Sequence, residues 1–418
     1  MPERTNGWAS VPELLTREMI PVPTMLIRGG TSKGVFLRPS DLPEDRTLWG
    51  PYLIDLFGAR DVRQIDGLGG AMPTTSKCCI VGPSGHPEAD VDYTFAQVAI
   101  GEERVFWDFN CGNLTPSVGT FAILAGMVPA KPGLTTVRVY QTNTKMLLTI
   151  EVPTDDDGAP LVEGDYVNAG VTGTGAAVWT DFSRATGASL GGDLFPTGHR
   201  ADVLDVPGIG KVTATIVDLA NMCVFFRAGE AGLTGYEMPE QGPDVVDTFT
   251  AVRHAAQDLL GVDHAKTTPW PITVAPPKAY ETYGGKGTLA AADYDFAVRF
   301  AGIQPMRDTL HEAHPGTASC GTAIAAVTRG TVVHELYAAR PRGDDNVTFG
   351  HPSGTITVEA RVHYEGDRPV ADRAVLGRTV RPIMAGTALV RRAEVDRLAS
   401  AIDRSDRTRS TVPEPGRA

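Results

Sequence analysis

Glycine and proline interrupt this chain so often that it can form few long elements of secondary structure. There are 46 glycines and 31 prolines among 418 residues, and both residue types tend to end helices and strands. Between them lie short runs rich in Val, Ile, Thr and Phe, which favour strands. Six such runs are predicted strands: 137–143, 147–152, 212–219, 223–228, 271–275 and 354–364. We therefore expect a protein built mainly from antiparallel strands.

Helical patterns are fewer, and the clearest cover 116–127, 245–260, 318–327 and 392–403. Strands followed by one small-residue helix, twice along the chain, predict an α+β fold rather than a doubly wound nucleotide-binding sheet. No glycine-rich fingerprint for phosphate occurs either.

The two halves of the chain contain similar segments. NCGNLTPSVGTFAILAG at 110–126 and SCGTAIAAVTRG at 319–330 each place Cys-Gly just before a small-residue helix. This indicates a duplicated architecture with one such helix start in each domain. We predict domains at 22–200 and 201–392, divided near the polar segment GDLFPTGHR, and a solvated, disordered tail at 404–418.

Charge and cysteine content narrow the class of partner. Lys and Arg number 38 against 50 Asp and Glu, a net charge of −12, which disfavours nucleic acid or an anionic membrane as partner. The five cysteines are an odd number without zinc-like spacing, so we expect free thiols in a reducing compartment. No segment has the length and apolar character of a membrane span or a signal peptide, which predicts a cytoplasmic protein. The sequence leaves the oligomeric state open, a homo-oligomer included.

Cys111 is the first candidate for chemistry. It lies in FNCGNLT, directly before an apolar helix, and free backbone amides at a helix start can stabilise a thiolate and bind a carboxylate. A thiolate beside a bound carboxylate can take a proton from the adjacent carbon. The alternative is a buried structural cysteine.

Lys77 is the second candidate. It follows a Gly-rich turn and a run of small hydroxyl residues, and it leads into an apolar strand. A lysine there must find a partner, or desolvation favours its neutral form, which can receive a proton. The alternative is an edge-strand lysine whose amine reaches solvent. Cys78 and Cys79 alternate across the same strand, so packing roles are expected for both.

Two further turns contain residues that suit anion binding. IRGGTSKG at 27–34 combines glycines, hydroxyls and cations in a short turn. In GHPSG at 350–354, His351 is either a base or part of a turn that positions Ser353 for a carboxylate. His311 and His314 lack further ligands at metal-binding spacing, so no metal site is predicted.

Together, several ordered motifs resemble the PrpF family, which includes 2-methylaconitate cis-trans isomerase, 4-oxalomesaconate tautomerase and 3-methylitaconate delta-isomerase. The motifs span about residues 25 to 390 and are RGGTSKGVFL at 28–37, GLGGAMPTTSK at 67–77, NCGNLTPSVGTFAI at 110–123, LFPTG at 194–198, DLANMCVFF at 218–226, GHPSGTITVEA at 350–360 and RTVRPIMAG at 378–386. The chain departs from the family at Ala220-Asn221-Met222-Cys223, where the family usually has Gly-Asn-Pro.

The resemblance implies a diaminopimelate-epimerase-like fold, with two similar domains that each wrap a curved antiparallel sheet around a central helix. It implies that Lys77 and Cys111 are the acid/base residues, that the substrate is a small unsaturated polycarboxylate, and that no cofactor is needed. The candidate substrate-binding residues are Thr31, Ser32, Lys33, Thr75, Ser76, Asn110, Gly112, Asn113, Leu114, Ser319, Cys320, His351 and Ser353.

Two other functions remain open from the sequence. SCGTA at 319–323 is similar to the second cysteine loop of two-base epimerases, so the chain could be an amino-acid epimerase or racemase that uses Cys111 and Cys320 on opposite faces of one carbon. The other alternative is a non-catalytic accessory protein that binds a carboxylate, although such a protein needs neither a reactive thiol nor a buried amine.

Overall fold

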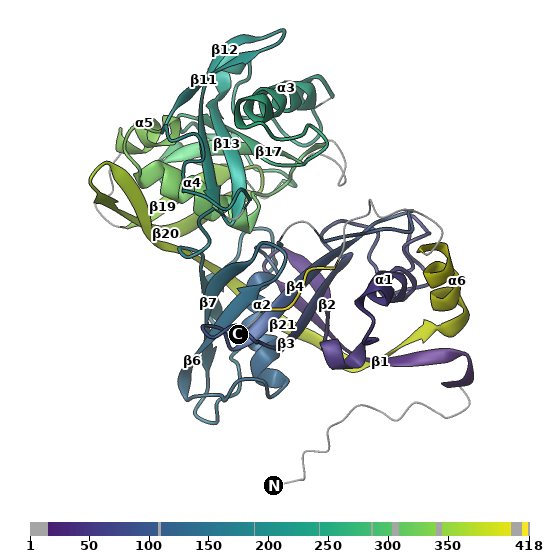
Figure 1. Ribbon diagram of the computed structural model, residues 1–418. Helices are drawn as coiled ribbons and strands as arrows, with labels where there is room; N and C mark the ends of the chain where they lie inside the picture. Colours follow the sequence, from purple (N-terminus) through teal and green to yellow (C-terminus); the bar gives the residue numbers. More distant parts are fainter. Residues whose placement is uncertain are drawn as a thin grey trace. The chain divides into compact units, whose positions relative to one another are not determined.

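The computed structural model describes residues 16–107, 110–187, 189–241, 243–285, 287–302, 309–339, 345–402 and 412–416. The chain divides into two compact units (Figure 1). Unit 1 contains Met1–Val167, Gly173–Val178 and Arg378–Ala418, and unit 2 contains Asn168–Thr172 and Trp179–Gly377.

The division differs from the predicted boundary near residue 200. The chain leaves unit 1 between residues 167 and 179, and residues after 377 return to it. The return is made by the long strand β21 (Arg368–Arg391), whose second half pairs antiparallel with β1 (Met19–Gly29). Pairing between strands so distant in the chain leaves no local signal in the sequence.

The predicted tail falls partly outside the described residues, which omit 403–411 and 417–418. Residues 412–416 pack on unit 1 instead of being solvated. Val412 contacts its apolar core, and the amide of Gly416 donates to an Asp92 carboxylate oxygen at 2.8 Å.

Unit 1 is a mixed sheet wrapped around one helix. Its ladder runs β1, β2 (Ser32–Leu37), β3 (Lys77–Pro83), β4 (Val91–Val98), β6 (Gly133–Gln141) and β7 (Met146–Thr154), with the short β5 (Val105–Phe106) beside β4. Successive pairings along this ladder are antiparallel, parallel, antiparallel, parallel and antiparallel. The short strands β8 (Tyr166–Val167) and β9 (Thr174–Gly175) pair with each other, and β10 (Ala177–Asp181) follows.

Helix α2 (Thr115–Leu124) forms the centre of unit 1, and Thr115 to Ile123 are all buried (Figure 1). Its small residues let the helix approach the sheet closely. A side chain at Gly119 would lie 2.7 Å from an Ile150 methyl carbon of β7, so only glycine fits there. The expected small-residue helix at 116–127 is thus confirmed, with its start one residue earlier.

Unit 2 repeats this plan. Its ladder begins with β11 (Asp202–Val206) and continues through β12 (Gly210–Leu219), β13 (Asn221–Arg227), β14 (Trp270–Ala275), β17 (Phe296–Gly302), β19 (Asn346–His351) and β20 (Gly354–Glu365). From β12 onward the pairings are again antiparallel, parallel, antiparallel, parallel and antiparallel. Short strands β15 (Tyr280–Glu281), β16 (Thr288–Leu289) and β18 (Thr309–Leu310) lie between these.

The central helix of unit 2 is α4 (Gly316–Val327). In the chain it lies between β17 and β19, the fourth and fifth strands counted from β12, as α2 lies between β4 and β6 in unit 1. All its residues from Gly316 to Ala326 are buried. Helix α3 (Pro243–Leu260) joins β13 to β14, and α1 (Trp49–Phe57) joins the equivalent pair in unit 1. Helix α5 (Val332–Ala338) follows α4. The matching order of strands, helices and pairing directions supports the duplication inferred from the two Cys-Gly segments.

One detail of that comparison was wrong. Cys111 precedes α2, as expected, but α4 begins at Gly316, directly after Pro315, so Cys320 lies inside the helix rather than before it. All six predicted strands and the other predicted helices are confirmed. Ala220, in the segment that departs from the PrpF pattern, has a left-handed φ of 60°, a conformation that glycine adopts more easily.

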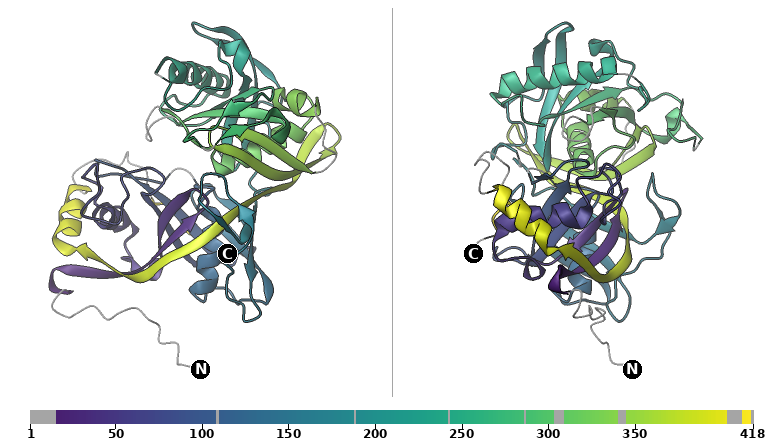
Figure 2. Two further views of the ribbon diagram at one scale, coloured as in Figure 1. Left: turned by 180° about the vertical axis from the view of Figure 1, so that it is seen from behind. Right: turned by 90° about the vertical axis from the view of Figure 1, so that its right-hand side faces the viewer.

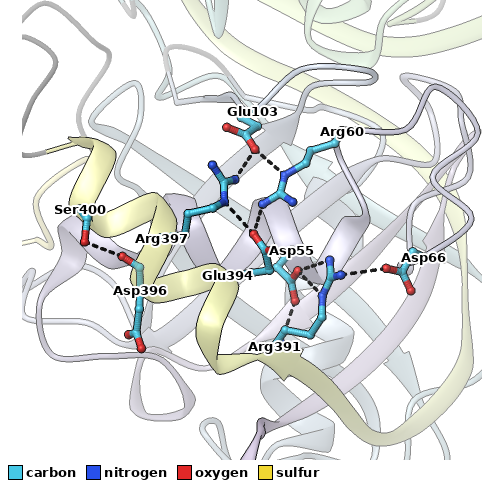
Figure 3. Close-up of polar contacts among 9 residues, drawn as sticks. All are labelled: Asp55, Arg60, Asp66, Glu103, Arg391, Glu394, Asp396, Arg397 and Ser400. Carbon is cyan, nitrogen blue, oxygen red and sulfur yellow. Dashed lines mark hydrogen bonds and ion pairs between the residues drawn. The ribbon is translucent and has the colours of Figure 1, made fainter.

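The last helix, α6 (Arg392–Ile402), packs beside α1 in unit 1 (Figure 2). Ion pairs join the two helices and the neighbouring loops (Figure 3). Asp55 of α1 is nearly buried and accepts from the amide, Nε and Nη2 of Arg391 at 2.8, 2.9 and 2.6 Å. Glu394 pairs with Arg60 and Arg397, whose hydrogen bonds lower the pKa of its carboxyl to about 2.

We predict that Asp55→Asn lowers the free energy of unfolding by about 2 kcal/mol, because it weakens hydrogen bonds between a nearly buried carboxylate and a guanidinium. Asp66→Asn is the matched control, since Asp66 is 74% exposed and pairs with the same Arg391 at 3.2 Å. It should change stability by less than about 0.5 kcal/mol. Urea unfolding of both variants measures the two free energies of unfolding. Equal losses of stability in the two variants would show that the Asp55–Arg391 pair contributes no more than the exposed Asp66–Arg391 pair.

Candidate functional site

Lys77 is the first residue of β3 and lies in the interior of unit 1. Its backbone pairs with Gly34 of β2 and Gln97 of β4, and the residue is only 6% exposed. The ammonium donates to Oε1 of Gln97 at 2.7 Å and lies 5.2 Å from the centre of the Phe95 ring. Among the residues that the structure describes, no carboxylate pairs with it. The buried cation is therefore held by a neutral amide and an aromatic face.

The Gln97 side chain has a fixed orientation. Its Nε2 donates to the carbonyl oxygens of Ser76 at 2.9 Å and Pro73 at 3.2 Å. Because both amide hydrogens are directed to carbonyls, the oxygen of the same amide must face Lys77. The loop before β3 thus determines where the acceptor for the Lys77 ammonium lies.

A second buried amide, Gln64, supports this loop. Its Oε1 accepts from the amide of Ala71 at 2.9 Å and from the hydroxyl of Ser76 at 2.5 Å. Gln64 and Ala71 both have left-handed backbones, with φ of 50° and 58°, which cost energy unless surrounding contacts impose them. Gly69 has no side chain to collide with Gln64, whose amide carbon would lie 2.3 Å from an added Cβ. The loop is held in one conformation directly before Lys77.

Cys111 lies in the loop that enters α2 and is 8% exposed. Its carbonyl accepts from the amides of Leu114 and Thr115, both at 3.0 Å. Its thiol lies 4.0 Å from the Ser32 hydroxyl of the turn between β1 and β2. Within the described part of the chain, the amides of Cys111, Gly112 and Asn113 have no hydrogen-bond acceptor. Consecutive free amides at a helix start can bind an anion.

The Cys79 thiol lies close enough to both candidates to be influenced by their charges. Burial raises its pKa well above the ordinary value, and the neighbouring Cys78 adds to this, while a hydrogen bond with Tyr93 opposes it. A charge on Cys111 raises this pKa further and the charge of Lys77 lowers it. Ser32, whose hydroxyl lies 4.0 Å from the Cys111 thiol, is two residues before Gly34, the β2 residue that pairs with Lys77.

Asn143 links the structural supports of the two residues. Its side chain accepts from the amide of Phe95 at 2.7 Å and donates to the carbonyls of Phe95 and Trp107 at 2.8 Å. Phe95 forms the aromatic face under Lys77, and Trp107 lies shortly before Cys111 in the chain. One amide therefore fixes the aromatic support of Lys77 relative to the segment that leads to Cys111.

Nine of the predicted substrate-binding residues belong to unit 1, on the segments next to Lys77 and Cys111 and at the start of β2. The Thr31–Lys33 turn is tied to the loop before β3 by the Lys33 amide, which donates to Thr74 O at 2.9 Å. The remaining members lie in the two loops already described: Thr75, Ser76, Asn110, Gly112, Asn113 and Leu114. Ser76 and Leu114 are fully buried, and the Ser76 hydroxyl is bonded to Gln64.

The other four lie in unit 2. Ser319 and Cys320 are fully buried in α4, where the Ser319 hydroxyl donates to Pro315 O at 2.9 Å and the Cys320 thiol faces Ala374 O at 3.6 Å. His351 ends β19, and its Nδ1 accepts from the amide of Ser353 at 3.2 Å. The Ser353 hydroxyl donates to Glu312 O at 2.6 Å. His351 therefore bonds within the turn that contains Ser353, and a role of either residue in carboxylate binding stays a prediction.

Sequence reasoning missed Gln97, Gln64, Phe95 and Asn143, which hold the pair in place. Gln97 gave one usable signal, because it is an amide within the apolar segment TFAQVAI at 94–100, and a buried amide must be hydrogen-bonded.

In the described residues, no group of three or more His, Cys, Asp or Glu side chains is arranged to hold a metal ion. No helix there combines the length and the apolar character that crossing a membrane requires.

Comparison with known proteins agrees with this architecture. The family model described as PrpF protein matches residues 19–391. The chain belongs to the PrpF family. A PrpF-family relative named 3-methylitaconate isomerase, from Eubacterium barkeri, is 39% identical over 90% of this chain and 98% of its own. Another, 2-methyl-aconitate isomerase of Shewanella oneidensis, is 38% identical over 88% of this chain and 96% of its own.

Solved structures confirm the fold. A methylitaconate-delta-isomerase superimposes with a TM-score of 0.78 at 38% identity, covering 90% of this chain and 97% of the other. A probable proline racemase from Agrobacterium radiobacter, only 10% identical, matches with a TM-score of 0.51 over 88% and 92% of the two chains, so the likeness concerns the fold alone. The PrpF-family chain has the diaminopimelate-epimerase-like fold that the motifs implied.

We predict that iodoacetamide alkylates Cys111 before any other cysteine of the native protein. Cys78, Cys79, Cys223 and Cys320 are completely buried, and burial raises the pKa of the Cys78, Cys79 and Cys223 thiols, whereas Cys111 is 8% exposed at the entrance to α2. Peptide mass spectrometry after partial labelling identifies the modified residue. First labelling at Cys79 or Cys320 would contradict this account of the loop.

Proposed function

We propose that this chain is an isomerase that shifts a proton across the allylic system of an unsaturated di- or tricarboxylate. Lys77 and Cys111 form its acid/base pair. The observation that carries the proposal is the placement of a buried ammonium without a carboxylate partner, among the described residues, near a thiol at a helix entrance. The names of the relatives, which are isomerases of methylitaconate and methylaconitate, support it.

The chemistry requires one residue to take a proton from an allylic carbon beside a carboxylate. The carbon–carbon double bond then moves by one position, and the other residue gives a proton to the far carbon. Substrate and product have the same composition and oxidation state, so the step needs no redox cofactor. Two groups that exchange protons can serve both ends of such a system.

Negative charge develops on the substrate carboxylate as the first proton leaves. The free amides of Cys111, Gly112 and Asn113 at the entrance to α2 are suited to receive that charge, because backbone donors fixed before the reaction need no reorganisation. Further carboxylates of the substrate would bind at the Thr31–Lys33 turn, where Ser32 lies beside the Cys111 thiol. The Gln97 amide oxygen and the Phe95 ring hold the Lys77 amine in place.

The test is turnover of 3-methylitaconate, 2-methylaconitate, trans-aconitate and 4-oxalomesaconate by purified protein and two variants. Lys77→Ala should lower kcat by about 100- to 10,000-fold, because proton transfer by a positioned group contributes this much. Cys320→Ser should keep kcat within about threefold, because the Cys320 thiol faces the carbonyl oxygen of Ala374 at 3.6 Å.

A two-cysteine epimerase would show the reverse order, with Cys320→Ser inactive and Lys77→Ala active, and would convert amino-acid enantiomers instead. A carboxylate-binding accessory protein would bind these acids, for example in calorimetry, yet turn over none of them. Either outcome would refute the proposal.

A further inference from the structure

We propose that Gln97 is a positioning residue for Lys77, because its neutral amide orients the ammonium without adding a charge beside it. This inference rests on the proposed function of Lys77 and adds a residue that acts on it.

The backbone pairing places the Gln97 side chain beside that of Lys77. The two residues are a directly opposed pair on β3 and β4, so their side chains leave the sheet side by side. The Gln97 oxygen is 2.7 Å from the Lys77 nitrogen, while its nitrogen is committed to Ser76 O and Pro73 O. Rotation of the Gln97 amide would place an NH₂ group against an ammonium and its oxygen against two carbonyls. The amide therefore accepts from Lys77 in one orientation only.

The charges around Lys77 determine what a neutral amide at position 97 can do. Among the described residues, the titratable groups close to Lys77 include Cys78 and Cys79 on its own strand, Tyr93 on β4 and Lys33 on the adjacent strand β2, with Cys111 in the loop before α2. Burial keeps the Cys79 and Tyr93 groups protonated, because it raises the pKa of both. A glutamate at position 97 would add a permanent negative charge at hydrogen-bond distance and retain the proton on Lys77. An amide binds the same ammonium without this effect.

A comparison with Gln64 distinguishes orientation of Lys77 from general stabilisation of the loop before β3. Gln64 holds the same loop through Ser76 Oγ and the Ala71 amide, but no contact joins it to Lys77 in the described structure. If Gln97 only stabilised the loop, changes at 64 and 97 would have the same kinetic consequences. If Gln97 acts on Lys77, only changes at 97 alter the pH dependence of turnover.

The experiment compares pH–rate profiles of wild type, Gln97→Glu, Gln97→Met and the control Gln64→Met. For Gln97→Glu we expect the limb that reports loss of the Lys77 proton to move up by about 1 to 3 pH units, the effect of an opposite charge at this distance. For Gln97→Met we expect kcat to fall at least about tenfold with KM within about threefold, because the ammonium loses its orienting acceptor. Gln64→Met should lower the melting temperature, because it removes the bonds to Ala71 and Ser76, and should keep the wild-type pH midpoints.

A Gln97→Glu profile that coincides with the wild type, while its melting temperature falls, would overturn the proposal in favour of a structural role. Should the charged variant fail to fold, Gln97→Asn keeps the amide and withdraws it from Lys77 by one methylene. A kcat loss of at least about tenfold at unchanged KM then supports positioning, and wild-type kcat refutes it.

The Lys77→Ala variant distinguishes failure of the proposed function from failure of the inference about Gln97. If Lys77→Ala retains turnover, the proposed function of Lys77 fails. If it is inactive and the Gln97 variants behave as wild type, only the present inference fails.

Discussion

The structure of the site depends on one unusual burial, that of the Lys77 ammonium at the start of an apolar strand. A cation removed from water is costly unless its hydrogen bonds are satisfied, and here the acceptor is an amide rather than a carboxylate. The loop before β3 is arranged around that contact. Gln97 donates to two of its carbonyls, and Gln64 accepts from the Ala71 amide and the Ser76 hydroxyl within it. An ion pair would have neutralised the lysine more strongly and made its proton harder to remove.

Duplication has produced two units with the same order of strands around a central helix, yet they are not equivalent chemically. The third strand of the repeated series begins with Lys77 in unit 1 and with Trp270 in unit 2. The cysteine of unit 1 lies in the loop before its helix and is 8% exposed, whereas Cys320 lies within α4 and is fully buried. Both residues of the proposed acid/base pair therefore belong to unit 1, and unit 2 carries candidate binding groups such as the turn of His351 and Ser353.

Much of this could be predicted from local sequence. Val, Ile and Thr runs identified the strands, and the small residues after Cys111 identified the central helix, because both signals arise from neighbouring residues. The domain boundary could not be predicted, since it depends on β21 pairing with β1 across most of the chain. Cys111 and Lys77 were recognisable by their motifs. Their supports, Gln97 and Asn143, were not, because each acts through contacts with residues distant in the sequence.

The most direct test of the account is to follow the reaction of 3-methylitaconate or 2-methylaconitate in deuterium oxide by proton NMR. The account predicts that wild-type enzyme places deuterium at a carbon of the shifted allylic system, and that Lys77→Ala and Cys111→Ser each abolish isomerisation. Turnover of the same acid by both variants at the wild-type rate, with the usual deuterium incorporation, would contradict the assignment of Lys77 and Cys111 as the acid/base pair.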